Sequence, residues 1–331
     1  MTLQSVEIAP PISVGTIRPI DITRDLAPLA DLLHEAFKGY IDADGVRSLR
    51  QMRRMARNRR AQRQILARGE MPGMPYYGYV YEVDGRLVGN VTLVPIRHKG
   101  QRLYLVVNVA VAPAYRRRGI ARALMLRAEQ HARRRRARAL WLQVDENNEA
   151  AVRLYEDLGF EKHSVVTLWR SGEVPADAPI AVPSPEVRVR KRLTPRPLWD
   201  LERAWFTEAY PPELGWHHLL PSWELLAPTV LGLWQRLKSG VWALHWRALR
   251  GNELVGAVAL LPRSYAVSDE VALALPADPA PAEVAALLQP ILRRKKPIRA
   301  EYPRGRAAKA LRSAGLWPAR YLRWMVKKIS A

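Results

Sequence analysis

The first half of the chain alternates between two hydrophobic patterns. Short alternating or β-branched segments predict strands, and segments with apolar residues three or four positions apart predict helices. The dipeptide Asp84-Gly85 between two such strands is typical of a tight hairpin turn. The expected elements are strand 16–19, helix 26–37, Arg-rich helix 45–69, strands 76–83, 87–95 and 103–111, helix 119–137, strand 139–144, helix 148–158 and strand 163–169. This order predicts an α/β fold.

The second half repeats parts of the first. LVGNVTLVP (87–95) is echoed by LVGAVALLP (254–262), and LYEDLGFEKHSVVTLWR (154–170) by ALRSAGLWPARYLRWMV (310–326). Such self-similarity predicts a tandem duplication. The Pro-rich residues from 174 to 185 are typical of a linker. We therefore expect a first domain over 1–172, a linker over 173–185 and a second domain over 186–331.

Composition narrows the classes of function. The 331 residues carry a net charge of +22, spread over both halves, which suits a nucleic-acid or acidic partner but also follows from an arginine-rich composition. The absence of cysteine excludes thiolate catalysis, and seven scattered histidines suggest no metal site. No apolar run is long enough to span a membrane, and the first residues lack the pattern of a signal peptide. A cytoplasmic protein without membrane contact is expected, and nothing indicates an oligomeric state.

Residues 103–122, LYLVVNVAVAPAYRRRGIAR, predict a strand, a short turn and the start of a helix. A helix N-terminus leaves backbone N–H groups unpaired, and these bind phosphate well. Gly119 permits close approach of an anion, and the neighbouring arginines add positive charge. The segment therefore predicts a pyrophosphate-binding turn. The corresponding segment of the second half, LALPADPAPAEVAALL (273–288), has no glycine or arginine, so we expect one such turn in the chain.

Two motifs resemble those of the GNAT superfamily of N-acetyltransferases. The first is the Arg-x-x-Gly-x-Ala pattern at Arg116, Gly119 and Ala121, and the second is NNEAAVRLYEDLGF, which ends at Phe160. The resemblance covers residues 16–170. Within it, residues 103–160 are most similar to ribosomal-protein Nα-acetyltransferases. It implies two tandem GNAT-like domains, each with a mixed, centrally splayed β-sheet flanked by helices, the second one degenerate.

The resemblance also implies acetyl-CoA as cofactor and direct transfer of its acetyl group to a primary amine in a ternary complex. The Tyr155 hydroxyl would protonate the departing thiolate, although the residue could instead be a core aromatic. Asn148 would contact the pantetheine arm, and it also suits a helix N-cap. The implied cofactor-binding residues are Val109, Ala110, Val111, Arg116, Arg117, Arg118, Gly119, Ile120, Ala121, Arg122 and Asn148.

The general base is less well defined. The enzymes that the second motif resembles carry a glutamate at the position of Gln143, and an amide cannot accept a proton at neutral pH. Asp145 lies two residues further on and would face the same side of the strand, which makes it the candidate base. Glu82 and Glu146 are alternatives, as is a chain of water molecules. Asp145 could equally be a surface carboxylate at a strand end.

Two further features concern the acceptor, a small-molecule or peptide amine. Nine arginines lie from Arg47 to Arg68, and they form either a solvated helix face or a surface for anionic groups of the acceptor. Seven of the eleven tryptophans lie from Trp199 to Trp246, where they pack in a core, line a pocket or stack on bases. The spacing of Trp242 and Trp246 is typical of core packing. The alternative function is a non-catalytic, basic acyl-CoA-binding module that acts through nucleic acid or a protein partner.

Overall fold

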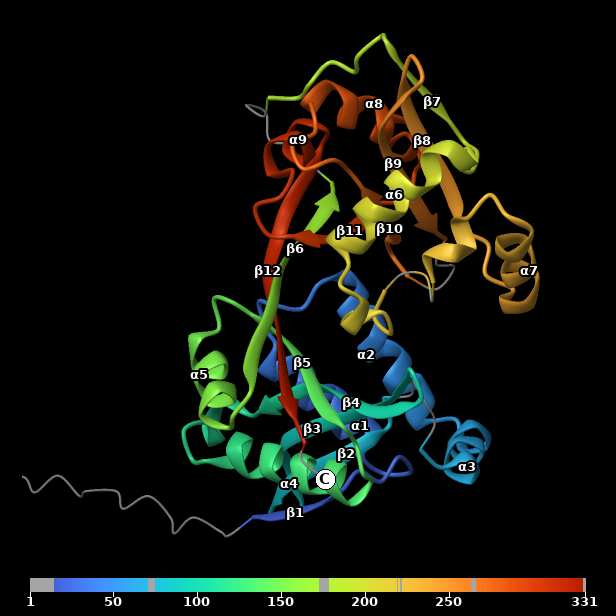
Figure 1. Cartoon of the computed structure of the whole chain (residues 1–331). Helices are drawn as coiled ribbons and strands as arrows, with labels where there is room; N and C mark the ends of the chain where they lie inside the picture. Colours follow the sequence, from blue (N-terminus) through green and yellow to red (C-terminus); the bar gives the residue numbers. More distant parts are fainter. Residues whose placement is uncertain are drawn as a thin grey trace, which may run out of the picture. The chain divides into compact units, whose positions relative to one another are not determined.

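The computed structural model describes residues 15–70, 75–172, 179–218, 220, 222–262 and 266–329 (Figure 1). They form two compact units. The first comprises the described residues up to Ile96, Arg102–Leu140 and Ile329, and the second comprises Arg97–Gln101 and Trp141–Lys328. The predicted domain bounds at 172 and 186 stay a prediction. Part of the predicted linker, residues 173–178, lies outside the described residues.

The first unit has the strand order β1-β2-β3-β4, and both β1 and β3 pair antiparallel with β2. Its elements are β1 (Thr16–Pro19), α1 (Leu26–Ala36), α2 (Ala43–Ala56), α3 (Arg59–Arg68), β2 (Tyr77–Val83), β3 (Arg86–His98), β4 (Gln101–Val111), a 3₁₀ turn (Pro113–Tyr115) and α4 (Ile120–Arg134).

The single Arg-rich helix predicted over 45–69 is wrong, because the segment forms two helices, α2 and α3. The Asn58 side chain accepts a hydrogen bond from the Ala61 amide and so caps the start of α3. An asparagine in that role favours a new helix start over continuation. Leu49 is the one fully buried residue of α2, and most arginines of the two helices are exposed.

Gly89 sets how closely α4 packs on the sheet. A Cβ atom at this position of β3 would lie 2.8 Å from Ile120 and 3.0 Å from Leu124, both on α4. The second repeat has the same arrangement, because a Cβ at Gly256 in β9 would lie 3.1 Å from Leu287 in α8. The glycine of each LVG sequence therefore allows a helix to approach its strand.

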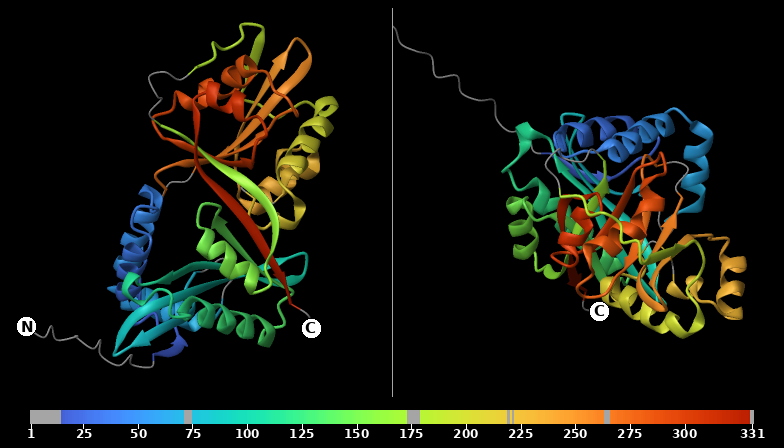
Figure 2. Two further views of the ribbon diagram at one scale, coloured as in Figure 1. Left: turned by 90° about the vertical axis from the view of Figure 1, so that its left-hand side faces the viewer. Right: turned by 90° about the horizontal axis from the view of Figure 1, so that it is seen from above.

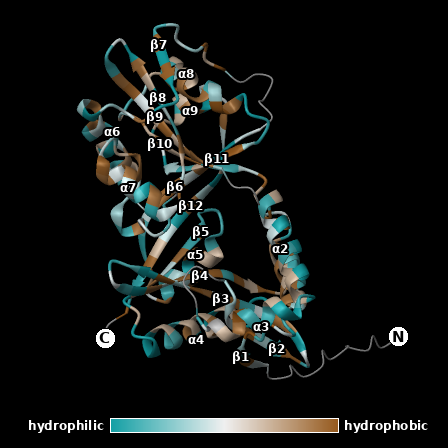
Figure 3. Ribbon diagram, turned by 90° about the vertical axis from the view of Figure 1, so that its right-hand side faces the viewer, coloured by the Kyte–Doolittle hydropathy of each residue, from teal (hydrophilic) through white to brown (hydrophobic). Residues whose placement is uncertain are grey.

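The second unit has the strand order β5-β12-β6-β11-β10-β9-β8-β7, in which residues 141–145 of β5 take part. Its strands are β5 (Ala139–Asp145), β6 (Glu161–Ser171), β7 (Val187–Arg190), β8 (Leu244–Arg250), β9 (Glu253–Leu261), β10 (Asp269–Ala274), β11 (Ile298–Pro303) and β12 (Leu316–Lys328). Its helices are α5 (Glu149–Asp157), α6 (Arg196–Ala209), α7 (Val230–Ser239), α8 (Pro281–Leu292) and α9 (Ala308–Ser313), with 3₁₀ turns at Pro212–Leu214 and Trp223–Leu226. Strands β9 and β10 are mostly buried and largely apolar (Figure 3).

The last strands of the two repeats pair with each other. Strand β12 lies between β5 and β6, and β6 pairs antiparallel with β12 on one side and with β11 on the other. The two long strands, light green and red, run side by side in Figures 1 and 2. Because of this pairing, β6 and α5 belong to the second compact unit although they precede the Pro-rich segment in sequence.

Candidate active site

Strand β4 is interrupted by a backbone irregularity. Asn108 has a φ of +54°, which is uncommon inside a strand. Its carbonyl accepts a hydrogen bond of 2.7 Å from the side-chain amide of Asn90 in β3, and that amide also donates to Thr92 at 3.1 Å. Asn90 is fully buried. The sequence interpretation missed Asn90, although a buried-strand pattern interrupted by one asparagine is the signal that could have revealed it.

The irregularity precedes the predicted cofactor-binding part of β4. Val109 and Val111 are half-buried and Ala110 is buried. Because amides two residues apart in a strand project from the same edge, those of Val109 and Val111 share one edge. A strand whose ladder is disturbed in this way can present amides to an extended ligand.

The turn before α4 has the conformation expected of an anion site. Arg117 and Gly119 both have positive φ, at +64° and +75°, and Gly119 is the N-cap of α4. The first hydrogen bond into the helix runs from the Ala123 amide to the Gly119 carbonyl at 3.0 Å, so the preceding amides are the N-terminal donors. A Cβ at Gly119 would meet no atom within 4 Å, so the space beside the turn is open. These features fit the pyrophosphate of acetyl-CoA.

The arginine side chains of the turn have different surroundings. The Arg116 guanidinium donates to the carbonyls of Ala36 at 3.0 Å and Val111 at 3.3 Å, so it joins the end of α1 to the end of β4. The Arg118 guanidinium lies over the Tyr115 ring, 5.1 Å from its centroid. Ile120 is buried, Ala121 is half-buried, and Arg117, Arg118 and Arg122 are exposed. In this turn the backbone, more than Arg116, is available to an anion.

Asn148 and Tyr155 lie on α5, in the second unit. The Asn148 side chain accepts a hydrogen bond from the Ala151 amide at 3.2 Å, so its expected N-cap role is confirmed. Tyr155 is 7% exposed and packs against Phe160, with ring centroids 5.9 Å apart. Burial raises the pKa of the Tyr155 hydroxyl well above its usual value, so the group keeps its proton at neutral pH.

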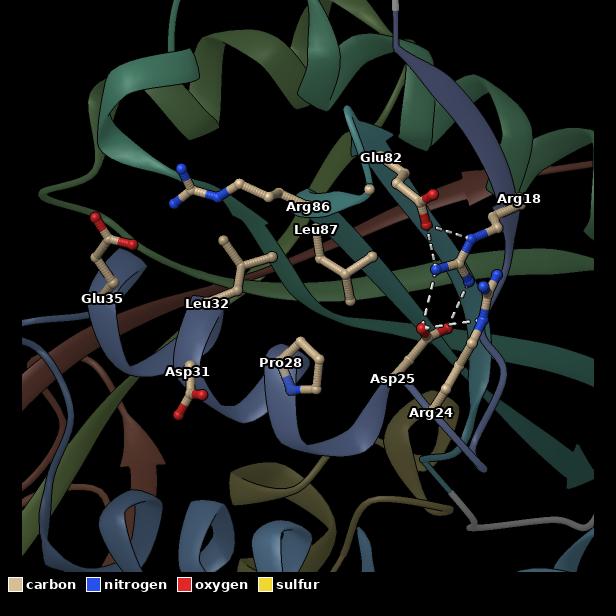
Figure 4. A pocket seen from close by; sticks show the side chains of 11 residues that line it. Arg18, Arg24, Asp25, Pro28, Asp31, Leu32, Glu35, Glu82, Arg86 and Leu87 are labelled. Atoms are coloured by element: carbon tan, nitrogen blue, oxygen red, sulfur yellow. Dashed lines mark hydrogen bonds and ion pairs between the residues drawn. The ribbon is translucent and has the colours of Figure 1, made fainter.

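All three carboxylates considered as bases are paired with arginines. Asp145 accepts from Arg320 at 2.8 Å and from the Asn147 amide at 3.0 Å. Glu146 is paired with two arginines of the second repeat, Arg304 and Arg323. Glu82 accepts from Arg18 at 2.7 Å at the wall of a cavity of about 530 Å³ that α1 and the β2–β3 hairpin help to line (Figure 4). Arg18 also binds Asp25 in this cavity, so one guanidinium contacts both carboxylates.

Gln143 has a different kind of partner. Its side-chain amide lies 3.2 Å from a carboxylate oxygen of Glu301 in β11, and the same oxygen lies 3.3 Å from Nε2 of His217. Burial alone would lower the pKa of His217, but the hydrogen bond and charge of Glu301 outweigh it, and the net pKa is raised. Burial would likewise raise the pKa of Glu301, but the contact with His217 prevails and that pKa is lowered. The sequence interpretation missed both residues.

Two negative findings apply to the described part of the chain. It contains no group of three or more histidine, aspartate or glutamate side chains placed to hold a metal ion. No described helix has the length and apolar character needed to cross a membrane. The cytoplasmic location stays a prediction from the sequence.

Solved structures share this fold over nearly the whole chain. A tandem GNAT protein from the clavulanic acid biosynthesis pathway matches with a TM-score of 0.53 and 16% identity, over 96% of this chain and 99% of that one. A GCN5-related N-acetyltransferase from Sphaerobacter thermophilus matches with a TM-score of 0.58 and 15% identity, over 96% of each chain. The fold is therefore the tandem GNAT fold expected from the sequence.

Similarity at the sequence level covers part of the chain. Residues 43–160 match the model of the acetyltransferase (GNAT) family. An acetyltransferase of Pectobacterium atrosepticum is 38% identical over 91 residues, 28% of this chain and 62% of the relative. The [ribosomal protein bS18]-alanine N-acetyltransferase of Escherichia coli is 41% identical over 58 residues, 18% of this chain and 39% of the relative. This chain thus spans less than two thirds of either relative.

The predicted resemblance is confirmed, because residues 43–160 match the model of the acetyltransferase (GNAT) family and the chain has a tandem GNAT fold.

Proposed function

We propose that this protein is an N-acetyltransferase that moves the acetyl group of acetyl-CoA to a primary amine by direct attack. The observation that carries the proposal is the turn before α4, where Arg117 and Gly119 have positive φ beside open space. In this proposal the backbone amides from Arg117 to Arg122 bind the pyrophosphate, as helix N-termini do in general. The amides of Val109 and Val111 hold the pantetheine arm and the thioester carbonyl.

Tyr155 is the proposed general acid. During transfer the nitrogen of the neutral amine forms a bond to the acetyl carbonyl carbon, the C–S bond breaks, and the leaving sulfur takes the Tyr155 proton. The nitrogen loses one proton to solvent as the amide forms, and solvent returns a proton to Tyr155. The hydroxyl keeps its proton at neutral pH, as a general acid must before the thiolate forms beside it. Asn148 would hold the pantetheine arm through the part of its amide that does not cap α5.

Asp145 is a weaker candidate for the base than its position in sequence suggested. One of its oxygens accepts from Arg320 and the other from the Asn147 amide. These contacts favour a role in holding the turn between β5 and α5.

The acceptor proposed here is an amine on a small molecule or peptide. The mostly exposed arginines of α2 and α3 support an acceptor that carries anionic groups. The bS18-alanine N-acetyltransferase acts on a protein, as its name says, and a peptide amine therefore belongs among the candidates. A basic module that binds acyl-CoA without turnover is the competing function.

The test is to mix the protein with acetyl-CoA and a panel of amines while free CoA is measured. We expect turnover with at least one amine, and a drop of about 10²- to 10⁴-fold for Tyr155→Phe with acetyl-CoA affinity retained. Phe160→Leu removes the neighbouring ring but no hydroxyl, and serves as the packing control. Binding of acetyl-CoA without turnover on any amine would reject the enzyme in favour of the binding module, and steeply salt-dependent binding of RNA would then identify its partner class.

A further inference from the structure

Glu301 differs from the other carboxylates near β5 in what surrounds it. Asp145 and Glu146 form ion pairs with arginines, whereas the hydrogen-bond partners of the Glu301 carboxylate among the described residues are the amide of Gln143 and the imidazole of His217. Arg299 on the same strand acts on Glu301 and His217 through its charge, as Glu270 does on His217. A guanidinium keeps its own proton at neutral pH and cannot act as a base. An imidazole partner can instead gain and lose a proton near neutral pH.

Gln143, His217 and Glu301 form a cluster that contains residues of both repeats and lies within the second unit. Gln143 is on β5 and Glu301 is on β11, and these strands are separated by β12 and β6. Three strand spacings amount to about 14 Å in a flat sheet, so the contact between these two side chains requires the sheet to twist or bend between β5 and β11. The twist of β6 and β12 is visible in Figure 2. Gln143 of the first repeat is thereby brought into contact with Glu301 of the second.

His217 is held in a defined orientation. Its backbone amide donates to the Leu214 carbonyl at 2.7 Å, which closes a tight turn after the 3₁₀ segment Pro212–Leu214. Because Nε2 faces Glu301, the other ring nitrogen, Nδ1, points away from the carboxylate. With the Nε2 proton donated to Glu301, Nδ1 is a proton acceptor. This is the arrangement of a base oriented by a carboxylate.

Aromatic rings form the wall beside this pair. The Trp324 ring centroid lies 4.6 Å from that of His217, Trp216 lies 5.7 Å from Trp324, and Trp141 lies 6.0 Å from Trp216. The His217 and Glu301 side chains remain 34% and 25% exposed, so a ligand can reach them. Indole rings beside a carboxylate favour an ammonium group.

We propose that this amine site, formed by His217, Glu301 and the neighbouring indole rings, receives the protonated amine of the acceptor and that His217 removes its proton. The inference rests on the acetyl transfer proposed above. The ammonium N–H bond breaks toward Nδ1 of His217, the freed lone pair attacks the acetyl carbon, and the leaving sulfur takes the Tyr155 proton. The second amine proton is lost to water as the amide forms. Gln143 is a positioning residue that holds the Glu301 carboxylate.

The same unit contains a matched control. His245 and Glu202 also form a pair, 2.8 Å apart, but their side chains are 2% and 0% exposed. No amine can reach that pair without unfolding. Glu202→Gln therefore removes a histidine–carboxylate interaction of the same kind, at a greater cost in stability and with no expected effect on proton transfer.

The first experiment measures CoA release against pH, with the amine that supports turnover, for wild type, His217→Gln, Glu301→Gln and Glu202→Gln. His217→Gln should lower kcat about 10²- to 10⁴-fold with acetyl-CoA affinity within twofold of wild type. Glu301→Gln should also move the acidic limb of the rate profile to lower pH. In Glu202→Gln the acidic limb should lie at the same pH as in wild type. A full rate and an unchanged limb in His217→Gln would overturn the proposal while leaving the acetyltransferase function intact.

The second experiment needs no turnover. NMR of protein labelled in its histidine rings follows the His217 signal, assigned with His217→Gln, during addition of butylamine or, as the uncharged control, butanol. We expect butylamine alone to shift the signal, and the shift to be lost in Glu301→Gln but kept in Glu202→Gln. An unchanged His217 signal with both compounds would overturn the amine site. If wild type turns over no amine, the proposed function fails and this shift alone decides whether the amine site exists.

Discussion

Replacing Gly119 with glutamate puts a carboxylate at the turn where we propose that the pyrophosphate binds. Gly119 has a φ of +75°, and a Cβ there would meet no atom within 4 Å. The substitution therefore adds side-chain atoms to open space and not to a packed core. Its cost to folding is the left-handed backbone of a residue with a side chain, about 1–2 kcal/mol.

The substitution should also weaken the binding of acetyl-CoA, because the new carboxylate repels the negative charges of the pyrophosphate. Two like charges 4 Å apart repel by about 1 kcal/mol in water and by about 4 kcal/mol at the effective dielectric of a protein surface. At about 1.4 kcal/mol for each tenfold change, acetyl-CoA should bind about 5- to 1000-fold more weakly. Gly119→Ala carries the backbone cost without the charge and should lose much less affinity.

Calorimetric titration with acetyl-CoA measures this difference, and thermal unfolding checks the fold. Gly100 supplies the control, since it has the same φ of +75°, no atom within 4 Å of a Cβ, and a place in the turn between β3 and β4. Gly100→Glu should lose comparable stability and keep its affinity. If Gly119→Glu bound acetyl-CoA as tightly as Gly100→Glu, the assignment of the pyrophosphate to this turn would be refuted.

Three further predictions follow from the contacts of the site. Asn90→Leu leaves the carbonyl of Asn108 without its buried donor, so we expect a loss of about 1–3 kcal/mol in urea unfolding and weaker acetyl-CoA binding. Gly89→Val puts a Cβ 2.8 Å from the first residue of α4, and overpacking of this kind should cost about 1–3 kcal/mol, measured as a lower Tm. Glu301→Gln should be most destabilising in mildly acidic solution, as urea titrations at several pH values would show. Glu301 stabilises only while ionised, so its contribution is lost as pH falls through its lowered pKa, and that of protonated His217 is lost as pH rises through its raised pKa.

Local patterns predicted local structure well. The expected strand 16–19 is β1 residue for residue, and the Asn148 cap begins α5 as expected. Both depend on residues close together in sequence. The helix predicted over 45–69 failed for a local reason as well, because Asn58 competes with the helix for backbone amides. Of the tryptophans predicted to pack in a core, Trp246 is 6% exposed and Trp242 is 56% exposed, so that prediction was right for the first and wrong for the second.

The candidate base could not be judged from the sequence, because its partners are far away along the chain. Asp145 meets Arg320 from a position 175 residues later, and Gln143 meets Glu301 from 158 residues later. Both contacts form because β12 and β11 lie near β5 in the same sheet. A hydrophobic pattern specifies that a strand is buried but not which strand it pairs with. The pairing of β6 with β12 could therefore not be predicted from the sequence.

The two repeats differ in how their central helices begin, and this difference separates their roles. Helix α4 starts after a glycine with open space beside it, whereas α8 starts at Pro281, which has no N–H to donate. The first turn of α8 already contains a buried carboxylate, Glu283, which accepts from Arg250 at 2.7 Å. These features do not favour an anion at that helix start. The second repeat nonetheless contributes Glu301, on its fifth strand β11. This residue contacts Gln143 on β5, the fifth strand of the first repeat. We infer that duplication allowed one repeat to keep the cofactor turn while the other acquired a charged group for the acceptor.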